Sequence, residues 1–291
     1  MSSRCLELGA GLAALMLACV AAHAAAPVPS QASSQPPSQP RELRVCADPA
    51  NLPYSQRDES GFENRIARLV AEDIGMRLNY FWQEQTRGFV RKTMGAGECD
   101  LFVGVPAGFD KVLRTRPYYR STYVAVTRRG TPPFAGFVPA ELHARRFGVQ
   151  LIGNDLAASP PGYALAEGGA VENVTGFLVY GDGPAGKRMV DAVAGGSIDV
   201  ALLWGPQAGF FARRAAVPLE VAPVKAPTGF AMPFEFAIAM GVRKGDTALR
   251  DRLDEVLARR RADIEAILDE YAVPRVHGAP PAPATVAGGQ P

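Results

Sequence analysis

The residues that usually carry acid–base and nucleophilic catalysis are scarce in this sequence. After residue 26 the histidines are His143 and His277, so a His-based pair or triad has almost no candidates. No G-x-S-x-G turn, H-E-x-x-H motif or paired C-x-x-C occurs, and no two carboxylates have a spacing that marks a catalytic pair. The sequence therefore predicts a protein that is not an enzyme and that needs no metal or cofactor.

One nucleotide-binding motif does occur, at Gly181-Asp182-Gly183-Pro184-Ala185-Gly186, between a predicted strand and a predicted helix. That is the context of a dinucleotide site, but such a site needs an acidic residue at the end of the next strand. Here that strand ends in Trp204-Gly205-Pro206. We interpret the motif as a Gly/Pro loop that opens a helix, where Lys187 and Arg188 could still meet a small anion.

Aromatic and polar residues gather where the predicted strands end. In open α/β sheets, ligands bind outside the carboxyl ends of the strands. The relevant segments are residues 48–54, 104–108 and 114–122 in one block, and residues 150–155 and 204–207 in another. The candidate cleft residues are Asp48, Tyr54, Arg87, Pro106, Tyr118, Tyr119, Arg120, Gln150 and Trp204. For any one of them, ordinary packing or surface exposure is an equal alternative to ligand contact.

Two similar blocks of alternating strands and helices must position these residues. In the first block we predict strands at 43–46, 78–82, 101–105 and 118–127, with helices at 64–74 and 89–94. In the second we predict strands at 147–150, 176–180, 199–204 and 219–221, with helices at 162–167 and 187–193. A last strand at 234–242 precedes a helical period over 249–271. Such alternation indicates mostly parallel sheets flanked by helices.

A repeated signature supports two similarly built lobes. Residues 97–104 (GECDLFVG) match residues 196–203 (GSIDVALL): a helix ends in Gly, a turn follows, and Asp introduces a buried strand. We expect residues 41–127 plus 232–275 to form lobe 1 and residues 128–231 to form lobe 2. The chain then crosses twice between the lobes, which predicts a two-segment hinge.

The two ends of the chain differ from the body. Residues 12–20 are an apolar run too short to span a bilayer, and Ala22-His23-Ala24 follows as a small-x-small cleavage pattern, so we expect a signal peptide at 1–26. Cys19 leaves a lipoprotein as an alternative. Residues 27–40 and 276–291 are Pro-rich with little to bury, which is typical of a linker and a disordered tail. The mature protein should lie outside the cytoplasm, without membrane insertion.

The net charge and the cysteine content bear on the class of partner and on disulfide formation. The chain has 31 Lys+Arg against 29 Asp+Glu, a net charge of +2, which gives no electrostatic case for nucleic acid. Two cysteines, Cys46 and Cys99, remain after cleavage, and both lie in strand patterns. They are either a disulfide, which would stabilise the fold by roughly 4 kcal/mol, or two buried thiols in adjacent strands.

The sequence resembles a known family over nearly all of residues 41–275. Residues 44–55 (RVCADPANLPYS), 61–75, 87–110, 115–126 (TRPYYRSTYVAV), 234–246 and 254–275 are similar to type II periplasmic solute-binding proteins. More narrowly, they resemble the quinoprotein-dehydrogenase-associated MoxJ/XoxJ group. The resemblance implies two lobes that close on a ligand, export to the periplasm, and no catalysis.

The resemblance also implies a partner. The MoxJ/XoxJ group is associated with a periplasmic PQQ-dependent methanol or alcohol dehydrogenase, so a role in its activation or maturation is expected. Amino-acid-binding relatives hold the ligand carboxylate with an Arg and its ammonium with an Asp; here Asp110-Lys111 and Trp204 occupy those regions. Each lost charge-assisted hydrogen bond is worth ~1.5–3 kcal/mol, which argues against an amino-acid ligand. The alternative is the receptor of an ABC importer for a small polar or aromatic solute.

Overall fold

A computed structural model describes residues 41–152, 157–179 and 181–277. The predicted signal peptide and linker, and the tail from residue 278 onward, lie outside the described residues. No helix in the described ranges is long and apolar enough to cross a bilayer.

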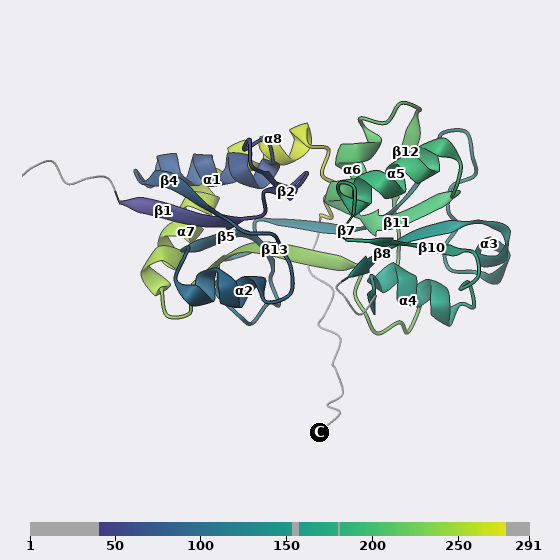
Figure 1. The fold of residues 1–291 in the computed structure, drawn as a ribbon, viewed down its shortest axis with the longest axis horizontal. Coiled ribbons are helices and arrows are strands. Elements are labelled where there is room, and N and C mark those ends of the chain that lie inside the picture. The colour runs from purple at the N-terminus through teal and green to yellow at the C-terminus, as the bar shows by residue number, and fades with distance from the viewer. Residues whose placement is uncertain (1–40, 153–156, 180, 278–291) are drawn as a thin grey trace, which may run out of the picture. The chain divides into compact units, whose positions relative to one another are not determined.

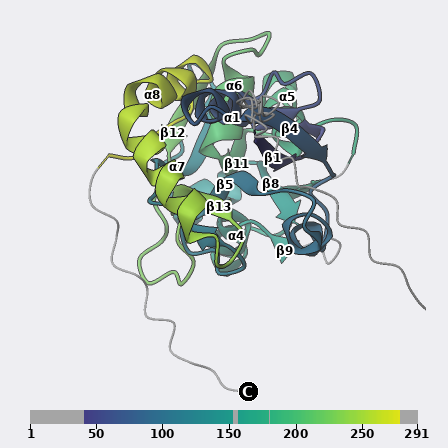
Figure 2. The same ribbon diagram turned by 90° about the vertical axis from the view of Figure 1, so that its left-hand side faces the viewer.

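An 11-stranded mixed sheet with helices on both faces dominates the described chain (Figures 1 and 2). Its strands are β1 (Glu42–Ala47), β4 (Arg77–Trp82), β5 (Leu101–Pro106), β6 (Leu113–Arg114), β7 (Tyr119–Arg128), β8 (Phe147–Ile152), β9 (Ala157–Ala158), β10 (Val174–Leu178), β11 (Val200–Trp204), β12 (Leu219–Pro223) and β13 (Glu235–Val242). A separate ribbon joins β2 (Ala50–Asn51) and β3 (Ser55–Gln56). The helices are α1 (Phe62–Asp73), α2 (Phe89–Lys92), η1 (Met94–Ala96), α3 (Pro139–Ala144), α4 (Pro160–Glu167), α5 (Ala185–Gly195), α6 (Gly205–Ala212), α7 (Thr247–Arg259) and α8 (Arg261–Glu270).

The main sheet consists of two halves with the same internal order. Its strand order is β10-β8-β11-β7-β13-β5-β1-β4. In the first half β1 lies between its parallel partners β4 and β5, and in the second half β8 lies between its parallel partners β10 and β11. Each half therefore has a core of three parallel strands flanked by helices, the α/β arrangement that the alternating pattern predicted, and antiparallel pairs with the remaining strands make the sheet as a whole mixed.

Two strands, β7 and β13, connect the halves. Residues 119–122 of β7 pair with residues 235–238 of β13, whereas residues 123–128 of β7 pair with β11 and β12 of the second half. The rest of β13 pairs with β5 of the first half. The pairing of β7 thus changes at Tyr123, four residues before the limit suggested by the sequence, and the lobe limits remain a prediction.

Helices on each face bury the apolar stripe of their sequence. In Figure 1, α1 lies on one face of the first half and α2 on the other, while α5 and α4 lie on opposite faces of the second half. The spacing of Phe62, Ile66 and Val70 puts these side chains on one face of α1, and all three are fully buried. Helix α6 was not predicted; the sequence analysis placed only the end of a strand at Trp204-Gly205-Pro206, although Pro is well tolerated in the first turn of a helix.

The segment after α8 packs closely on α6. A Cβ placed on Gly209 would lie 1.8 Å from the backbone oxygen of Ala272, so only glycine fits there. Farther along, the Ser121 hydroxyl donates to the Pro274 carbonyl at 2.6 Å, and the Val276 N–H donates to the Arg120 carbonyl at 3.1 Å. Residues 271–276 therefore make a third connection between the halves, in addition to the two strands.

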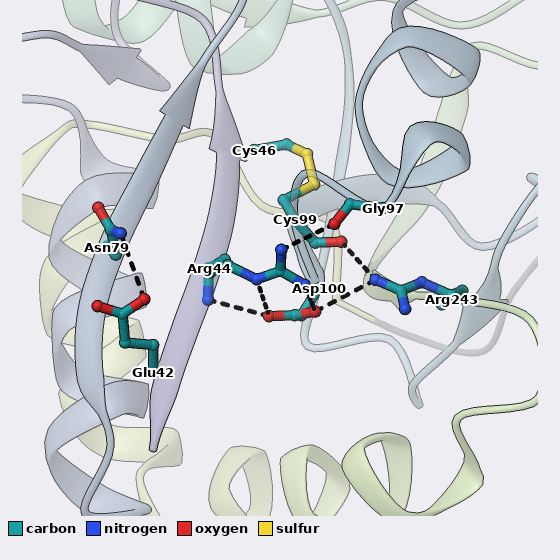
Figure 3. Close-up of polar contacts among 8 residues, drawn as sticks. All are labelled: Glu42, Arg44, Cys46, Asn79, Gly97, Cys99, Asp100 and Arg243. Atoms are coloured by element: carbon teal, nitrogen blue, oxygen red, sulfur yellow. Dashed lines mark hydrogen bonds and ion pairs between the residues drawn. A yellow bond between two sulfur atoms is a disulfide. The ribbon is translucent and has the colours of Figure 1, made fainter. Parts of the chain in front are cut away.

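The repeated signature is also a repeated set of contacts. In the first half Arg44 of β1 donates to both oxygens of Asp100, with Nη2–Oδ1 at 2.6 Å, and to the Gly97 carbonyl at 2.7 Å (Figure 3). In the second half Arg146 donates to both oxygens of Asp199, with Nη2–Oδ1 at 2.7 Å, and to the Gly196 carbonyl at 2.9 Å. Both glycines have positive φ, 80° and 77°, which a side chain would strain.

Cys46 and Cys99 form a disulfide, with Cα atoms 5.5 Å apart (Figure 3). The bond joins β1 to the residue that precedes Asp100, and Arg243 donates to the Cys99 carbonyl at 3.1 Å and contacts Asp100 at 3.3 Å. The structure confirms the predicted disulfide over the alternative of two free thiols.

Candidate functional site

A cavity of about 540 Å³ lies between the two halves. Its lining comes from the β2–β3 region, α1 and β5 of the first half, from β8, β11 and α6 of the second, and from both connecting strands. It therefore lies where the carboxyl ends of the parallel strands face each other, as expected for a ligand site in this architecture.

Aromatic rings form much of this lining. They are Tyr54, Tyr119, Tyr123, Trp204 and Phe236. Trp204, at the end of β11, packs edge-to-face against Tyr123 and Phe236, with ring centroids 5.4 Å and 5.7 Å apart. Burial raises the pKa of the Tyr54, Tyr119 and Tyr123 hydroxyls above their ordinary value, so these groups are neutral at physiological pH. The lining thus offers apolar ring surface with neutral hydroxyls.

Glu63 supplies the charged group of this cavity. It is the second residue of α1, and its carboxylate lies over the backbone of Gly104 in β5, where a Cβ would be 2.1 Å from Oε1. Within the described chain its carboxylate makes no hydrogen bond or ion pair. Burial raises the pKa of this carboxyl from 4.5 to about 7. Glu63 is therefore a carboxylate without a counter-ion, poised to change charge near neutral pH.

Polar groups extend the site into an adjoining cavity of about 370 Å³. Asp48 lies there, but its carboxylate is already used, since it accepts from the backbone N–H groups of Ala50 at 2.8 Å and Gln85 at 2.7 Å. Gln150 and Gln207 line both cavities. Gln207 is only 7% exposed, and its Oε1 has no hydrogen-bond partner in the described structure.

The structure brings most of the predicted cleft residues together. Tyr54, Pro106, Tyr119, Gln150 and Trp204 line the central cavity, and Asp48 lines the adjoining one.

Three predicted residues lie elsewhere. Tyr118 donates its hydroxyl to the Val103 carbonyl at 3.1 Å and lines a separate groove beside α7. Arg120, on the neighbouring position of β7, pairs with Glu235 at 3.3 Å and is not a lining residue of the central cavity. Arg87 is exposed in the loop between β4 and α2 and is likewise not a lining residue. Tyr118 and Arg120 are the neighbours of Tyr119, and successive side chains of an extended segment point to opposite faces, so both turn away from the cavity that Tyr119 lines.

Sequence reasoning missed Glu63, Tyr123, Gln207 and Phe236. Glu63 was unremarkable because acidic residues are common in the first turn of any helix. Its available signal was Gly104, a residue without a side chain inside an otherwise apolar strand, which indicates a close approach by another group. Gln207 was included only as part of the 204–207 segment, without the helix that positions it.

The G-x-G-x-x-G motif is a loop that leads into α5, as interpreted. Lys187 pairs with Asp191 at 2.6 Å, and Arg188 donates to the Leu178 carbonyl, so both cations already have partners within the chain. Among the described residues, no cluster of three or more His, Cys, Asp or Glu side chains could hold a metal ion.

Residues 43–274 match the bacterial extracellular solute-binding proteins, family 3, and the chain belongs to this family. It is 34% identical to MoxJ of Methylorubrum extorquens, over 92% of this chain and 93% of that protein. The crystal structure of the periplasmic binding protein XoxJ from Methylobacterium extorquens AM1 shares 37% identity, with a TM-score of 0.67 over 81% of this chain and 100% of XoxJ. Within the family, the chain therefore belongs with the MoxJ/XoxJ group.

The fold recurs at lower identity. MxaJ from Methlophaga aminisulfidivorans MPT has a TM-score of 0.70 at 22% identity, over 80% of this chain and 100% of MxaJ. At that identity the likeness concerns the fold alone.

Proposed function

We propose that this protein is an exported, non-enzymatic component of a periplasmic PQQ-dependent methanol or alcohol dehydrogenase system. In this proposal it binds the dehydrogenase, or a segment of it, in the cleft between its halves and assists activation or maturation. The single observation that carries the proposal is the likeness to MoxJ along almost the whole chain. The predicted signal peptide at 1–26 agrees with a periplasmic location.

The cleft supports the same proposal by what lines it. No Lys, Arg or His is among the described lining residues of the central cavity, and Asp110 and Lys111 lie exposed elsewhere with 79% and 67% of their side chains accessible. A free amino acid would find no cation for its carboxylate there. Ring surface with amide groups at its edge suits an apolar segment of a protein partner.

Binding of purified dehydrogenase to the immobilised mature protein tests the proposal. We expect saturable binding that Trp204→Ala weakens, because Trp204 lies at the centre of the aromatic lining. Tyr163→Ala is the matched control, since Tyr163 is 41% exposed on α4 and is not a lining residue of the cavity. No binding, together with normal dehydrogenase activity in cells that lack this protein, would refute the proposal.

A receptor for an ABC importer is the second candidate. The family itself and a cavity large enough for a small solute favour it. A ligand at 100 times its Kd should stabilise the fold by about 2.7 kcal/mol, which a thermal-shift screen of small solutes would detect. Neighbouring genes for a permease and an ATPase would favour this candidate, and genes for a dehydrogenase and a cytochrome c the first.

A further inference from the structure

The charges around the cleft have one sign. The described residues that line the central cavity include one charged group, Glu63, and the adjoining cavity adds Asp48 and Glu84. No basic side chain is among the described lining residues of either. Asp48 is satisfied by two backbone N–H groups, which leaves Glu63 as the carboxylate without a partner at the centre.

The groups beside Glu63 suit a positive charge as well. The faces of aromatic rings attract cations, most strongly when water is excluded, and five rings line this cavity. Gln207, at the edge of the same cavity, has an Oε1 that still lacks a hydrogen-bond donor. This atom is closed off beside Gly186 of α5, so a ligand N–H would satisfy it only after the Gln207 side chain turned toward the cavity.

We propose that the cleft binds an organic cation, an ammonium group on an apolar stem, with Glu63 as its counter-ion and the aromatic rings around the stem. A zwitterion is disfavoured because, with its ammonium group at Glu63, its carboxylate would find no cation among the described lining residues. The ligand is either a free alkylammonium ion or the side chain of a lysine in a protein segment; only the second source rests on the proposed function.

Binding should depend on pH through the charge of Glu63. The titratable groups that face it are Tyr54, Tyr80, Tyr118 and Tyr119, all neutral over the range concerned, with Asp48 in the side pocket beside it. With a carboxyl pKa of about 7, roughly nine-tenths of the molecules carry the charge at pH 8 and roughly one-tenth at pH 6. The apparent affinity for a cation should fall about tenfold between these values, because only the ionised fraction is competent.

Calorimetry on the mature protein with n-butylammonium tests the inference. 1-Butanol is the uncharged probe of the same size and butyrate the anionic one; a short peptide with one central lysine represents the second source. We expect butylammonium or the lysine peptide to bind at pH 8 and to bind about tenfold more weakly at pH 6. Neither 1-butanol nor butyrate should reach the affinity of the ammonium probe at pH 8. Binding of the peptide alone identifies a protein segment as the source, and binding of both identifies the ammonium group as sufficient.

Two variants separate the roles of charge and fold. Glu63→Gln should reduce affinity at pH 8 at least tenfold and abolish the pH dependence, with its thermal unfolding checked in parallel. Glu72→Gln, on the exposed part of the same helix, should bind like the unmodified protein. The inference is overturned if neither probe binds at pH 8, if 1-butanol or butyrate binds as well, or if folded Glu63→Gln retains full affinity. Dehydrogenase binding without any ammonium binding would overturn this inference alone.

Discussion

Replacing Glu63 by Gln should stabilise the folded protein at neutral and higher pH. Burial raises the pKa of this carboxyl from 4.5 to about 7, so between these values the folded state holds a proton that the unfolded state has released. Stability must then fall as pH rises through this window, because the folded state binds more protons than the unfolded state. Glutamine has nearly the same shape and no charge, and it removes this loss.

The magnitude follows from the same two values. Moving a pKa from 4.5 to about 7 corresponds to roughly 3 kcal/mol at about 1.4 kcal/mol per pH unit. The side chain is only partly buried, and the N-terminus of α1 favours a negative charge, so part of this cost is recovered. We expect Glu63→Gln to be more stable than the unmodified protein by about 1–2 kcal/mol at pH 8, and by a few tenths at about pH 5.

Urea unfolding at both pH values measures the difference directly. The gain from Glu63→Gln should grow from about pH 5 to about pH 8, whereas Glu72→Gln should give the same small difference at both. An equal or lower stability of Glu63→Gln at pH 8 would refute the assignment of a desolvated, unpaired carboxylate. A residue whose removal improves the fold but impairs binding has the pattern expected of a functional group.

Four further tests by substitution address other parts of the structure. Removing both Cys46 and Cys99 opens a loop of 53 residues and should lower the free energy of unfolding in urea by about 4 kcal/mol. If full reduction leaves the stability of the unmodified protein unchanged, the bond is absent. Gly104→Ala places a Cβ against Glu63 Oε1 and should displace the carboxylate, so butylammonium titration should show a loss of affinity while 1-butanol is unaffected. Asp100→Asn should lower the free energy of unfolding by about 2 kcal/mol, because the Asp100 side chain is 22% exposed and pairs with both Arg44 and Arg243. Asp199→Asn should lower it by about 1 kcal/mol or less, because the Asp199 side chain is 40% exposed and pairs with Arg146 alone. The reverse order in thermal unfolding would contradict this. Gly209→Ala places a Cβ where there is no room and should lower the free energy of unfolding by about 2 kcal/mol or more. Gly195→Ala, where a Cβ on α5 meets open space, should leave the stability unchanged or raise it slightly.

Hydrophobic periodicity predicted the strands and most helices because it depends only on neighbouring residues. The alternation at residues 43–46, 64–74 and 78–82 corresponds closely to β1, α1 and β4. Helix α6 is different, since Gly209 leaves room for the backbone of Ala272, more than sixty positions later in the chain, and Gly205 for residues 121 and 122, more than eighty positions earlier. No local pattern contains that information.

The candidate site shows the same division between local and long-range information. Trp204 and Tyr119 were found because strand ends are visible in the sequence. Arg120 was grouped with Tyr119, but it lies on the next position of the same strand and pairs with Glu235. Glu63 was missed because its unusual environment arises from Gly104 of β5 and Tyr119 of β7, which are distant in sequence.

The contact of residues 271–276 with α6 and β7 has a consequence for how the molecule unfolds. Two lobes joined only by a pair of strands could melt separately, each at its own temperature. Here residues 271–276 follow α8 of the first half and contact Gly209 of α6 and Ser121 of β7. Unfolding of one half therefore removes packing contacts from the other. The body of the protein should therefore unfold in one cooperative step, with a calorimetric enthalpy equal to the van't Hoff enthalpy.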